Sequence, residues 1–213
     1  MSAEGALPDP LADFGLIETL LWNRDAGWGL LDLHRARIAA SAAALGFTFT
    51  PQAFDAALAG AVGGEDELRV RLVLRRDGGF DVTAAPFVRD PPEKIWRVAV
   101  AAQKFDSRDP MLRHKTTRRA LYEDALAASG ADEVLFLNER DQVCEGARTN
   151  IFVERDGHYL TPPVACGLLP GVFRAFLNDH GWAEEQILRV ADLRANFYIG
   201  NSLRGLLRAR LDD

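Results

Sequence analysis

Residues 145–152 read Glu-Gly-Ala-Arg-Thr-Asn-Ile-Phe, and residues 113–117, upstream of them, read Arg-His-Lys-Thr-Thr. The first stretch has the composition of a strand end, a polar turn and the start of a second strand. This pattern places Glu145 where a carboxylate can point into a cleft. The second stretch is a basic loop that enters a predicted helix. Either stretch on its own is also what an ordinary surface loop contains, so their meaning depends on the rest of the chain.

Lysine is rare in this chain. The 25 basic residues comprise 22 arginines and only three lysines, Lys94, Lys104 and Lys115. Arginine keeps its proton under ordinary conditions, whereas a lysine amine can lose its proton and attack a carbonyl carbon. Amine chemistry in this protein therefore has three candidate residues.

The stretch from Gly167 to Arg174, Gly-Leu-Leu-Pro-Gly-Val-Phe-Arg, is a glycine-bracketed turn that runs directly into a predicted helix. Unpaired amides at the start of a helix bind phosphate through their N–H groups and the local dipole. The alternative is a surface helix that begins at a proline, which this stretch alone favours. Residues 200–202, Gly-Asn-Ser, could add a hydroxyl and further amides, and Arg37 could add a bidentate contact.

Length and composition indicate an ordinary globular protein. Of 213 residues, 48% are hydrophobic and 26% are charged, and no apolar run approaches the roughly 20 residues that span a bilayer. The first ten residues lack the basic start and apolar stretch of a secretory signal, and the two cysteines form no Cys-x-x-Cys pair. A cytoplasmic protein with reduced thiols is therefore expected. The net charge of −6 opposes general binding to nucleic acid.

The order of the predicted elements indicates an α+β fold. Helical spacing of apolar residues alternates with short β-prone runs that are separated by turn sequences. Strands are expected at 14–22, 69–75, 80–87, 95–101, 133–137, around 143, at 150–153 and at 196–200, and helices at 31–45, 50–62, 115–129 and from 169–171 to about 181. The Asp-Pro-Pro-Glu sequence at 90–93 blocks regular structure. We therefore expect a flexible tail over 1–12, a small domain over 13–91 and a larger domain over 92–213.

Taken in order, these motifs resemble the fold-type IV pyridoxal-phosphate (PLP) enzymes, the superfamily of branched-chain and D-amino-acid aminotransferases and of 4-amino-4-deoxychorismate lyase. The resemblance spans nearly the whole chain, and each motif is modestly specific while the five in order are strongly so. They are His34-x-x-Arg37, residues 114–117, Glu145 followed by residues 149–152, residues 167–174, and Asn201-Ser202. The resemblance implies a two-domain α+β architecture, in which a small N-terminal α/β domain precedes a larger, β-rich domain that binds the cofactor.

Within that superfamily, the segment from residue 114 to residue 202 is most similar to the lyase-type members, including the lyase-like domain fused to some aminodeoxychorismate synthase components. Transaminases related to the branched-chain enzymes usually carry a tyrosine five positions after the lysine, where it bonds the phenolate oxygen of PLP. Here that position is Ala120, and Tyr122 lies two residues further along. The expected reaction is therefore the conversion of 4-amino-4-deoxychorismate to 4-aminobenzoate and pyruvate, a step in folate precursor synthesis.

The resemblance also implies roles for individual residues. Lys115 would form a Schiff base with PLP and move the proton at the amine-bearing carbon, and Glu145 would pair with the pyridine nitrogen. The implied cofactor-binding residues are Arg37, Lys115, Glu145, Asn150, Gly171, Val172, Asn201 and Ser202. Candidates for substrate contact are Thr19, Arg148, Arg204 and Arg113, against the plainer interpretation of a strand threonine and solvent-facing arginines. No metal is implied, because the lyase chemistry needs none and the four histidines offer no ligand pattern.

Two alternatives stay open. The first is an aminotransferase that acts on branched-chain, aromatic or D-amino acids on the same scaffold. The second is a non-catalytic relative that binds PLP or a synthase partner without turnover. Members of this superfamily are usually homodimers with the cofactor in the cleft between the two domains. A homodimer is therefore expected by resemblance, with an aminodeoxychorismate synthase as a further candidate partner.

Overall fold

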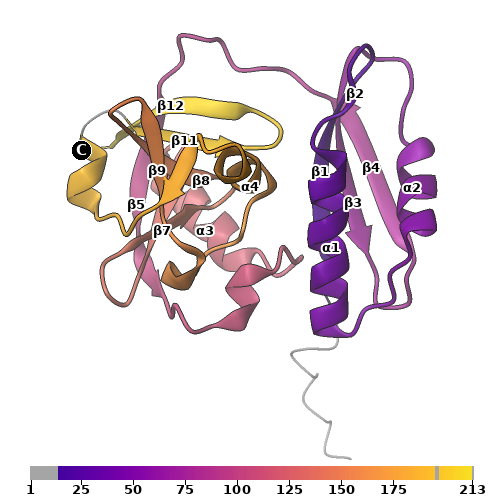
Figure 1. Ribbon diagram of the computed structural model, residues 1–213, viewed down its shortest axis with the longest axis horizontal. Coiled ribbons are helices and arrows are strands. Elements are labelled where there is room, and N and C mark those ends of the chain that lie inside the picture. The colour runs from indigo at the N-terminus through magenta and orange to yellow at the C-terminus, as the bar shows by residue number, and fades with distance from the viewer. Residues whose placement is uncertain (1–13, 195–196, 213) are drawn as a thin grey trace, which may run out of the picture.

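The computed structural model describes residues 14–194 and 197–212, which form two β-sheets with helices packed against them (Figure 1). The predicted α+β class is confirmed. The expected tail at 1–12 and the expected first residue of the last strand, Asn196, lie outside the described residues. The expected domain boundary at 91–92 falls in the connection between the two sheets. Among the described residues, no helix is long and apolar enough to cross a membrane.

The first sheet has four antiparallel strands in the order β2-β1-β3-β4. The strands are β1 (Leu16–Asn23), β2 (Gly27–Trp28), β3 (Glu67–Leu74) and β4 (Phe80–Pro86). Along β3, every second side chain from Leu68 to Leu74 is buried, while Arg69 and Arg71 lie on the opposite face. The period of two in the sequence therefore gives this sheet one apolar face and one polar face.

Two helices cover the apolar face of the first sheet (Figure 1). Helix α1 spans Leu31–Leu45, and helix α2 spans Pro51–Ala59. Thr50 caps α2, because its side chain accepts a hydrogen bond from the amide of Ala53 at 3.2 Å. Glu18 of β1 also points to this side, where α1 supplies its partners.

The second sheet has eight strands in the order β10-β9-β8-β11-β12-β5-β6-β7. Their bounds are β5 (Trp96–Phe105), β6 (Glu133–Asn138), β7 (Val143–Gly146), β8 (Asn150–Arg155), β9 (His158–Thr161), β10 (Ala183–Glu185), β11 (Phe197–Asn201) and β12 (Gly205–Leu211). Only three residues, 147–149, connect β7 to β8, although four other strands separate the two in the sheet. The sheet therefore curls until its β7 edge lies close to β8, and the connecting turn closes one end of the curl.

The helices of this second part begin later than the sequence predicts. Helix α3 spans Ala120–Ser129 rather than 115–129, and helix α4 spans Val172–Asp179. Residues 115–117 are instead extended, because they pair with the start of β1. The amide of Ile17 donates to the carbonyl of Lys115 at 2.7 Å, and the amide of Thr117 donates to the carbonyl of Gly15 at 2.9 Å. Strands β10 and β12 were not predicted, since one is very short and the other lies beyond the last recognised motif.

The pairing of residues 15–17 with 115–117 joins the two sheets. A second contact comes from α1, where the Ser41 hydroxyl lies 2.9 Å from the Nδ1 atom of His114. A third comes from the turn after β11, where the Ser202 hydroxyl donates to the carbonyl of Thr19 at 3.4 Å. The lysine segment is therefore held from both sides and not from its own sheet alone.

Candidate active site

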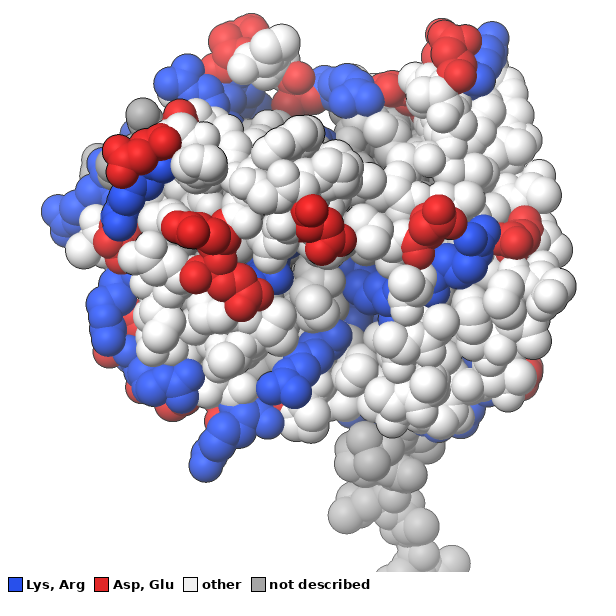
Figure 2. Space-filling view, viewed as in Figure 1, with Lys and Arg blue, Asp and Glu red and all other residues white. Residues whose placement is uncertain are grey.

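A cavity of about 600 Å³ lies where the two sheets meet. All of the predicted cofactor-binding residues and three of the four candidates for substrate contact border it, although they come from segments far apart in the sequence. These residues are Thr19, Arg37, Lys115, Glu145, Arg148, Asn150, Gly171, Val172, Asn201, Ser202 and Arg204. Basic side chains are visible in the groove between the two halves of the molecule (Figure 2). Arg113 is exposed and does not border the cavity, so the suggestion that it contacts substrate receives no support.

Lys115 presents its amine to this cavity in a position that favours the neutral form. Removal from water is the main cause, and the positive charges of Arg119 and Arg37 add to it. Glu18 and Glu145 act in the opposite direction. Together these effects lower the pKa of Lys115 from its ordinary value of 10.5 to about 7. A lysine amine with such a pKa is a nucleophile at neutral pH.

Glu145 is the last but one residue of β7 and is 5% exposed. Its two oxygens accept one hydrogen bond each, from the Tyr122 hydroxyl at 3.0 Å and from the Leu169 amide at 3.1 Å. Burial raises the pKa of the carboxyl to about 7, against the effect of these two donors. A carboxylate so poorly compensated would bind a further proton donor strongly, such as a protonated ring nitrogen.

Tyr122 lies two residues after Ala120, the position at which transaminases carry a tyrosine, and its contacts show which part of the cavity it serves. Its hydroxyl points to Glu145, and its ring packs against Phe105 and Phe136. The guanidinium of Arg119 lies 4.7 Å from the centre of the same ring. Tyr122 therefore belongs to the carboxylate end of the cavity and does not replace the tyrosine that transaminases carry at the position of Ala120.

A buried carboxylate that sequence reasoning missed holds the turn between Glu145 and Asn150. Glu133, at the start of β6, is fully buried. It accepts hydrogen bonds from the Ala147 amide at 3.1 Å, the Arg148 amide at 3.1 Å and the Thr149 hydroxyl at 3.0 Å. An acidic residue at the start of a strand gave no signal, because its partners lie in another segment of the chain.

The start of α4 is shaped for close approach of a ligand. Asn150 donates to the carbonyl of Leu169 at 3.1 Å. A Cβ atom at Gly171 would lie 1.8 Å from the Oδ1 atom of Asn150, so any other residue here would displace the Asn150 side chain. The amides of Gly171 and Val172, which border the cavity, are the unpaired donors expected at a helix start. Asn150 therefore acts here by shaping the loop.

Asn201 and Ser202 also have structural partners. The Asn201 side chain donates to the carbonyl of Arg148 at 3.2 Å and accepts from the amides of Leu203 and Arg204. It thereby ties the turn after β11 to the turn that follows Glu145. The hydroxyl of Ser202 remains close to the cavity at the junction with β1.

The arginines around the cavity fall into two groups. Arg148 donates to the carbonyl of Asp132 at 2.8 Å, and Arg204 donates to Asp90 at 3.1 Å. Within the described residues, no ion pair with a carboxylate is found for Arg69, Arg71 or Arg118, which the sequence analysis did not single out. The alternation Arg-Val-Arg in β3 was the available signal for Arg69 and Arg71. It placed both on one face without revealing that this face borders the cavity.

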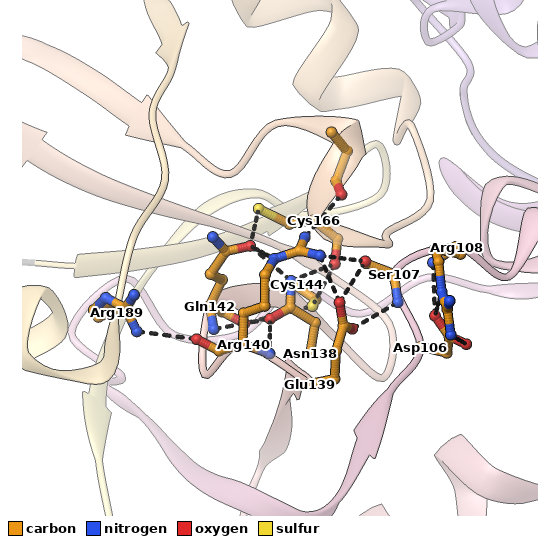
Figure 3. Close-up of polar contacts among 11 residues, drawn as sticks. Asp106, Ser107, Arg108, Asn138, Glu139, Arg140, Gln142, Cys144, Cys166 and Arg189 are labelled. Carbon is orange, nitrogen blue, oxygen red and sulfur yellow. Dashed lines mark hydrogen bonds and ion pairs between the residues drawn. The ribbon is translucent and has the colours of Figure 1, made fainter.

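A polar network outside the cavity fixes two of the loops that build it (Figure 3). Glu139 accepts hydrogen bonds from the amide and the hydroxyl of Ser107, at 2.9 and 2.8 Å, in the loop that leads to Lys115. Asn138 donates to the carbonyl of Cys166 at 2.9 Å, in the loop that leads to Gly171. The turn after β6 therefore sets the relative positions of the lysine loop and the glycine loop.

The geometry agrees with what comparison with known families finds. Residues 15–211 match the family described as amino-transferase class IV. The chain belongs to the class IV aminotransferases. The predicted family and the prediction of an enzyme are thereby confirmed. Within the part of the chain that the structure describes, no group of three or more His, Cys, Asp or Glu side chains could hold a metal ion.

Relatives of this class IV aminotransferase carry different names. It is 28% identical over 181 residues to the "Putative aminodeoxychorismate lyase" of Schizosaccharomyces pombe, covering 82% of this chain and 78% of that protein. A "Putative amino-acid aminotransferase" from Mesorhizobium loti superposes with a TM-score of 0.90 at 43% identity, covering 94% of this chain and all of the other. A branched-chain aminotransferase from Thermobaculum terrenum, solved in its PLP form, gives 0.75 at 18% identity, covering 99% and 81% of the two chains. Both lyase and aminotransferase names therefore occur among the relatives of this chain.

Proposed function

We propose that this protein is a PLP-dependent lyase that converts 4-amino-4-deoxychorismate to 4-aminobenzoate and pyruvate. The observation that carries the proposal is one cavity that joins a low-pKa lysine, a buried carboxylate and arginines for which the described residues supply no carboxylate partner. The first two features suit PLP chemistry, and the arginines suit a substrate with two carboxylates. The lyase name of the fission yeast relative supports the same reaction.

The residues around the cavity fit PLP. Lys115 offers an amine whose pKa of about 7 leaves a large fraction in the neutral form at neutral pH, and Glu145 offers a buried carboxylate with capacity for another donor. Gly171 leaves room that any side chain would fill, next to unpaired helix amides suited to a phosphate. Arg37 and Ser202 border the same cavity and would contribute further donors to the phosphate.

When bound, PLP supplies an electron sink that stabilises negative charge on the carbon next to the substrate amine. In the proposed reaction, Lys115 removes the proton from C4, the amine-bearing carbon of the substrate. Loss of the enolpyruvyl ether from the neighbouring carbon then yields an aromatic ring. Glu145 favours a protonated pyridine nitrogen, because a nearby negative charge raises the pKa of that nitrogen.

Charge on the cavity wall supports a substrate with two carboxylates. Arg69 and Arg71 of β3 lie beside Thr19 of β1, since Thr19 pairs with Arg71 in the sheet. Arg118 borders the cavity from the lysine segment. Arginine is well suited to carboxylates because its planar donors bind both oxygens at once. Arg148 and Arg204, which have other partners, would then frame the entrance.

An aminotransferase is the second candidate, because the Mesorhizobium loti protein carries that name at 43% identity. The same lysine and carboxylate serve both reactions, and the arginines would equally hold a dicarboxylic amino or oxo acid. The absence of a tyrosine at Ala120 favours the lyase over transaminases of the branched-chain type.

A side-by-side assay of the purified protein loaded with PLP separates the two. One arm supplies 4-amino-4-deoxychorismate and measures 4-aminobenzoate and pyruvate. The other supplies branched-chain, aromatic, acidic or D-amino acids with 2-oxoglutarate or pyruvate and measures the new amino acid. The lyase proposal expects product in the first arm at the higher kcat/KM, and a higher kcat/KM in the second arm would replace it.

We further propose that the protein works in the cytoplasm as a homodimer. The family resemblance supports both statements, and it also suggests an aminodeoxychorismate synthase as a partner that supplies the substrate. Light scattering coupled to size-exclusion chromatography checks the first assembly. A monomer at assay concentration would contradict it. Co-elution with a synthase, measured in the same way, checks the second.

A further inference from the structure

A buried ionic cluster lies behind the phosphate end of the cavity. Glu18 of β1 is 1% exposed, and both of its oxygens face α1. They accept hydrogen bonds from Arg37 Nε at 2.8 Å and from Arg37 Nη2 at 2.6 Å. His34, one helical turn before Arg37, is fully buried and places its Nδ1 atom 2.6 Å from the same carboxylate. We call these three side chains the Glu18 cluster.

The bidentate bond fixes the direction of the Arg37 guanidinium. A guanidinium is planar, and its Nε and Nη2 edge is fully used by Glu18. Nη1 lies in the same plane but away from this edge, and no partner for it is found within residues 14–194 and 197–212. Arg37 also borders the cavity, so the unused donors are the ones available to a ligand there. An unheld arginine would have several rotamers to lose on binding.

His34 completes the arrangement from the opposite side. Its Nδ1 atom faces a carboxylate and therefore carries the proton as donor. Burial is the largest influence on the ring and lowers its pKa, so the ring is neutral and its buried Nε2 atom, which has no partner, is a bare acceptor. The neutral ring donates one hydrogen bond to Glu18, and Arg37 remains the cation that pairs with the carboxylate.

We propose that Glu18 is a positioning residue for phosphate recognition, which holds Arg37 so that its free edge meets the phosphate of PLP. This inference rests on the proposed PLP site and says nothing about which reaction follows. Glu18 would not touch the cofactor itself, because its negative charge would repel the phosphate. It would act through Arg37, which lies between the two anions.

The test compares PLP with pyridoxal, which has the same aldehyde and ring but no phosphate. Affinities of both for the protein freed of cofactor are measured by absorbance and by quenching of protein fluorescence. Wild type sets the ratio of the two affinities. In Glu18→Gln, we expect PLP affinity to fall about tenfold or more while pyridoxal affinity stays close to that of wild type. A role in folding alone would weaken both ligands together.

A double-mutant cycle with Arg37→Ala links the effect to the arginine. Arg37→Ala should lower the PLP-to-pyridoxal ratio by itself, and adding Glu18→Gln should lower it no further. Should Glu18→Gln not fold, Arg37→Lys replaces it, because an ammonium cannot give Glu18 two parallel bonds and still offer a fixed free edge. A lowered ratio in Arg37→Lys then supports the proposal.

The other outcomes overturn the inference in ways that are distinguishable. In one outcome, Arg37→Ala lowers the ratio, but a folded Glu18→Gln variant keeps the wild-type ratio, or Arg37→Lys does so where it is used instead. Glu18 then does not position the arginine, and the proposed PLP site is unaffected. If Arg37→Ala keeps the wild-type ratio, the assignment of Arg37 to the phosphate falls with the inference. If wild type binds neither ligand, the proposed function fails as well.

Discussion

Glu18 and Glu145 are both buried glutamates, Glu145 in the lining of the cavity and Glu18 behind the lining residue Arg37, yet their charges behave in opposite ways. Glu18 is 1% exposed and Glu145 is 5% exposed. Burial raises the pKa of each, but at Glu18 the charge of Arg37 and the hydrogen bonds from Arg37 and His34 outweigh it and lower the pKa to about 2. At Glu145, a hydroxyl and one amide are too weak to do so, and the pKa rises to about 7.

The difference shows that burial alone does not determine what a carboxylate can do. A pair of charge-assisted bonds keeps Glu18 ionised at neutral pH, so its carboxylate is fully engaged in holding its partners. Two neutral donors compensate the charge of Glu145 only in part, so its oxygens can accept a further hydrogen bond from a cationic ligand. At the Arg37 end of the cavity the protein supplies its own counter-charge, whereas at the Glu145 end a bound ligand would supply it.

The most severe test removes the amine that both ends surround. In Lys115→Ala, we expect loss of the absorbance of bound PLP and a fall in turnover on the order of 10⁴-fold, because the base proposed to act at the reacting carbon is gone. Absorbance spectra and pyruvate release measure the two effects. Lys104→Ala, at an exposed lysine that pairs with Asp141, is the control and should change neither. Turnover near that of wild type would remove Lys115 from its proposed place.

The next test neutralises the cavity-facing carboxylate. Glu145→Gln should still bind PLP, while turnover falls by roughly 10³-fold because the charge that favours the protonated ring is lost. Spectra and kcat measure the two separately. Glu154→Gln offers a matched control, since Glu154 also accepts a tyrosine hydroxyl, from Tyr198 at 2.9 Å, but on the surface. Equal effects of the two substitutions would contradict the proposed contact with the ring.

The third test uses the stability of the protein without cofactor as a function of pH. The pKa of Glu18 lies below its ordinary value of 4.5, so its contribution is complete above about pH 4.5 and is lost as the pH falls toward about 2. The loss amounts to about 3 kcal/mol of unfolding free energy. Urea unfolding at several pH values should show this loss in wild type, and a smaller one in Glu18→Gln.

Glu145 should behave in the reverse sense in the same experiment. Its pKa lies above the ordinary value, so its contribution is complete below about pH 4.5 and is lost as the pH rises through about 7. Glu145→Gln should therefore recover stability on the neutral side only. Parallel pH profiles for the two variants would show that the two carboxylates do not differ as described.

The smallest expected effect comes from Tyr122, which donates to Glu145. In Tyr122→Phe, we expect turnover to fall about tenfold and the pKa of Glu145 to rise further, because a donor that favours the charged form is removed. The acidic limb of the pH profile of kcat should move to higher pH. Tyr198→Phe removes the hydroxyl that donates to the surface glutamate Glu154, and it should leave the acidic limb of the profile in place.

The sequence by its own patterns predicted the class of the fold, which is confirmed, and pointed to the residues that the proposed site places at its centre. Periods of two and of 3.6 in the apolar residues predicted most strands and helices, because burial of one face needs only local spacing. Motif order, together with the rarity of lysine, selected Lys115 and Glu145. The helix predicted at 115–129 was wrong over its first five positions, since backbone bonds to Gly15 and Ile17 compete with helix formation there.

Only the tertiary structure decided how these residues work together. Glu18 and Glu133 gave no signal in the sequence because their partners lie in segments remote along the chain. Arg37 was expected beside a phosphate, but its bidentate bond to Glu18 could not be predicted from helical spacing. Spacing along a chain reports which face a side chain occupies, whereas the pKa of a buried group depends on which atoms meet it there, and only the folded chain fixes those.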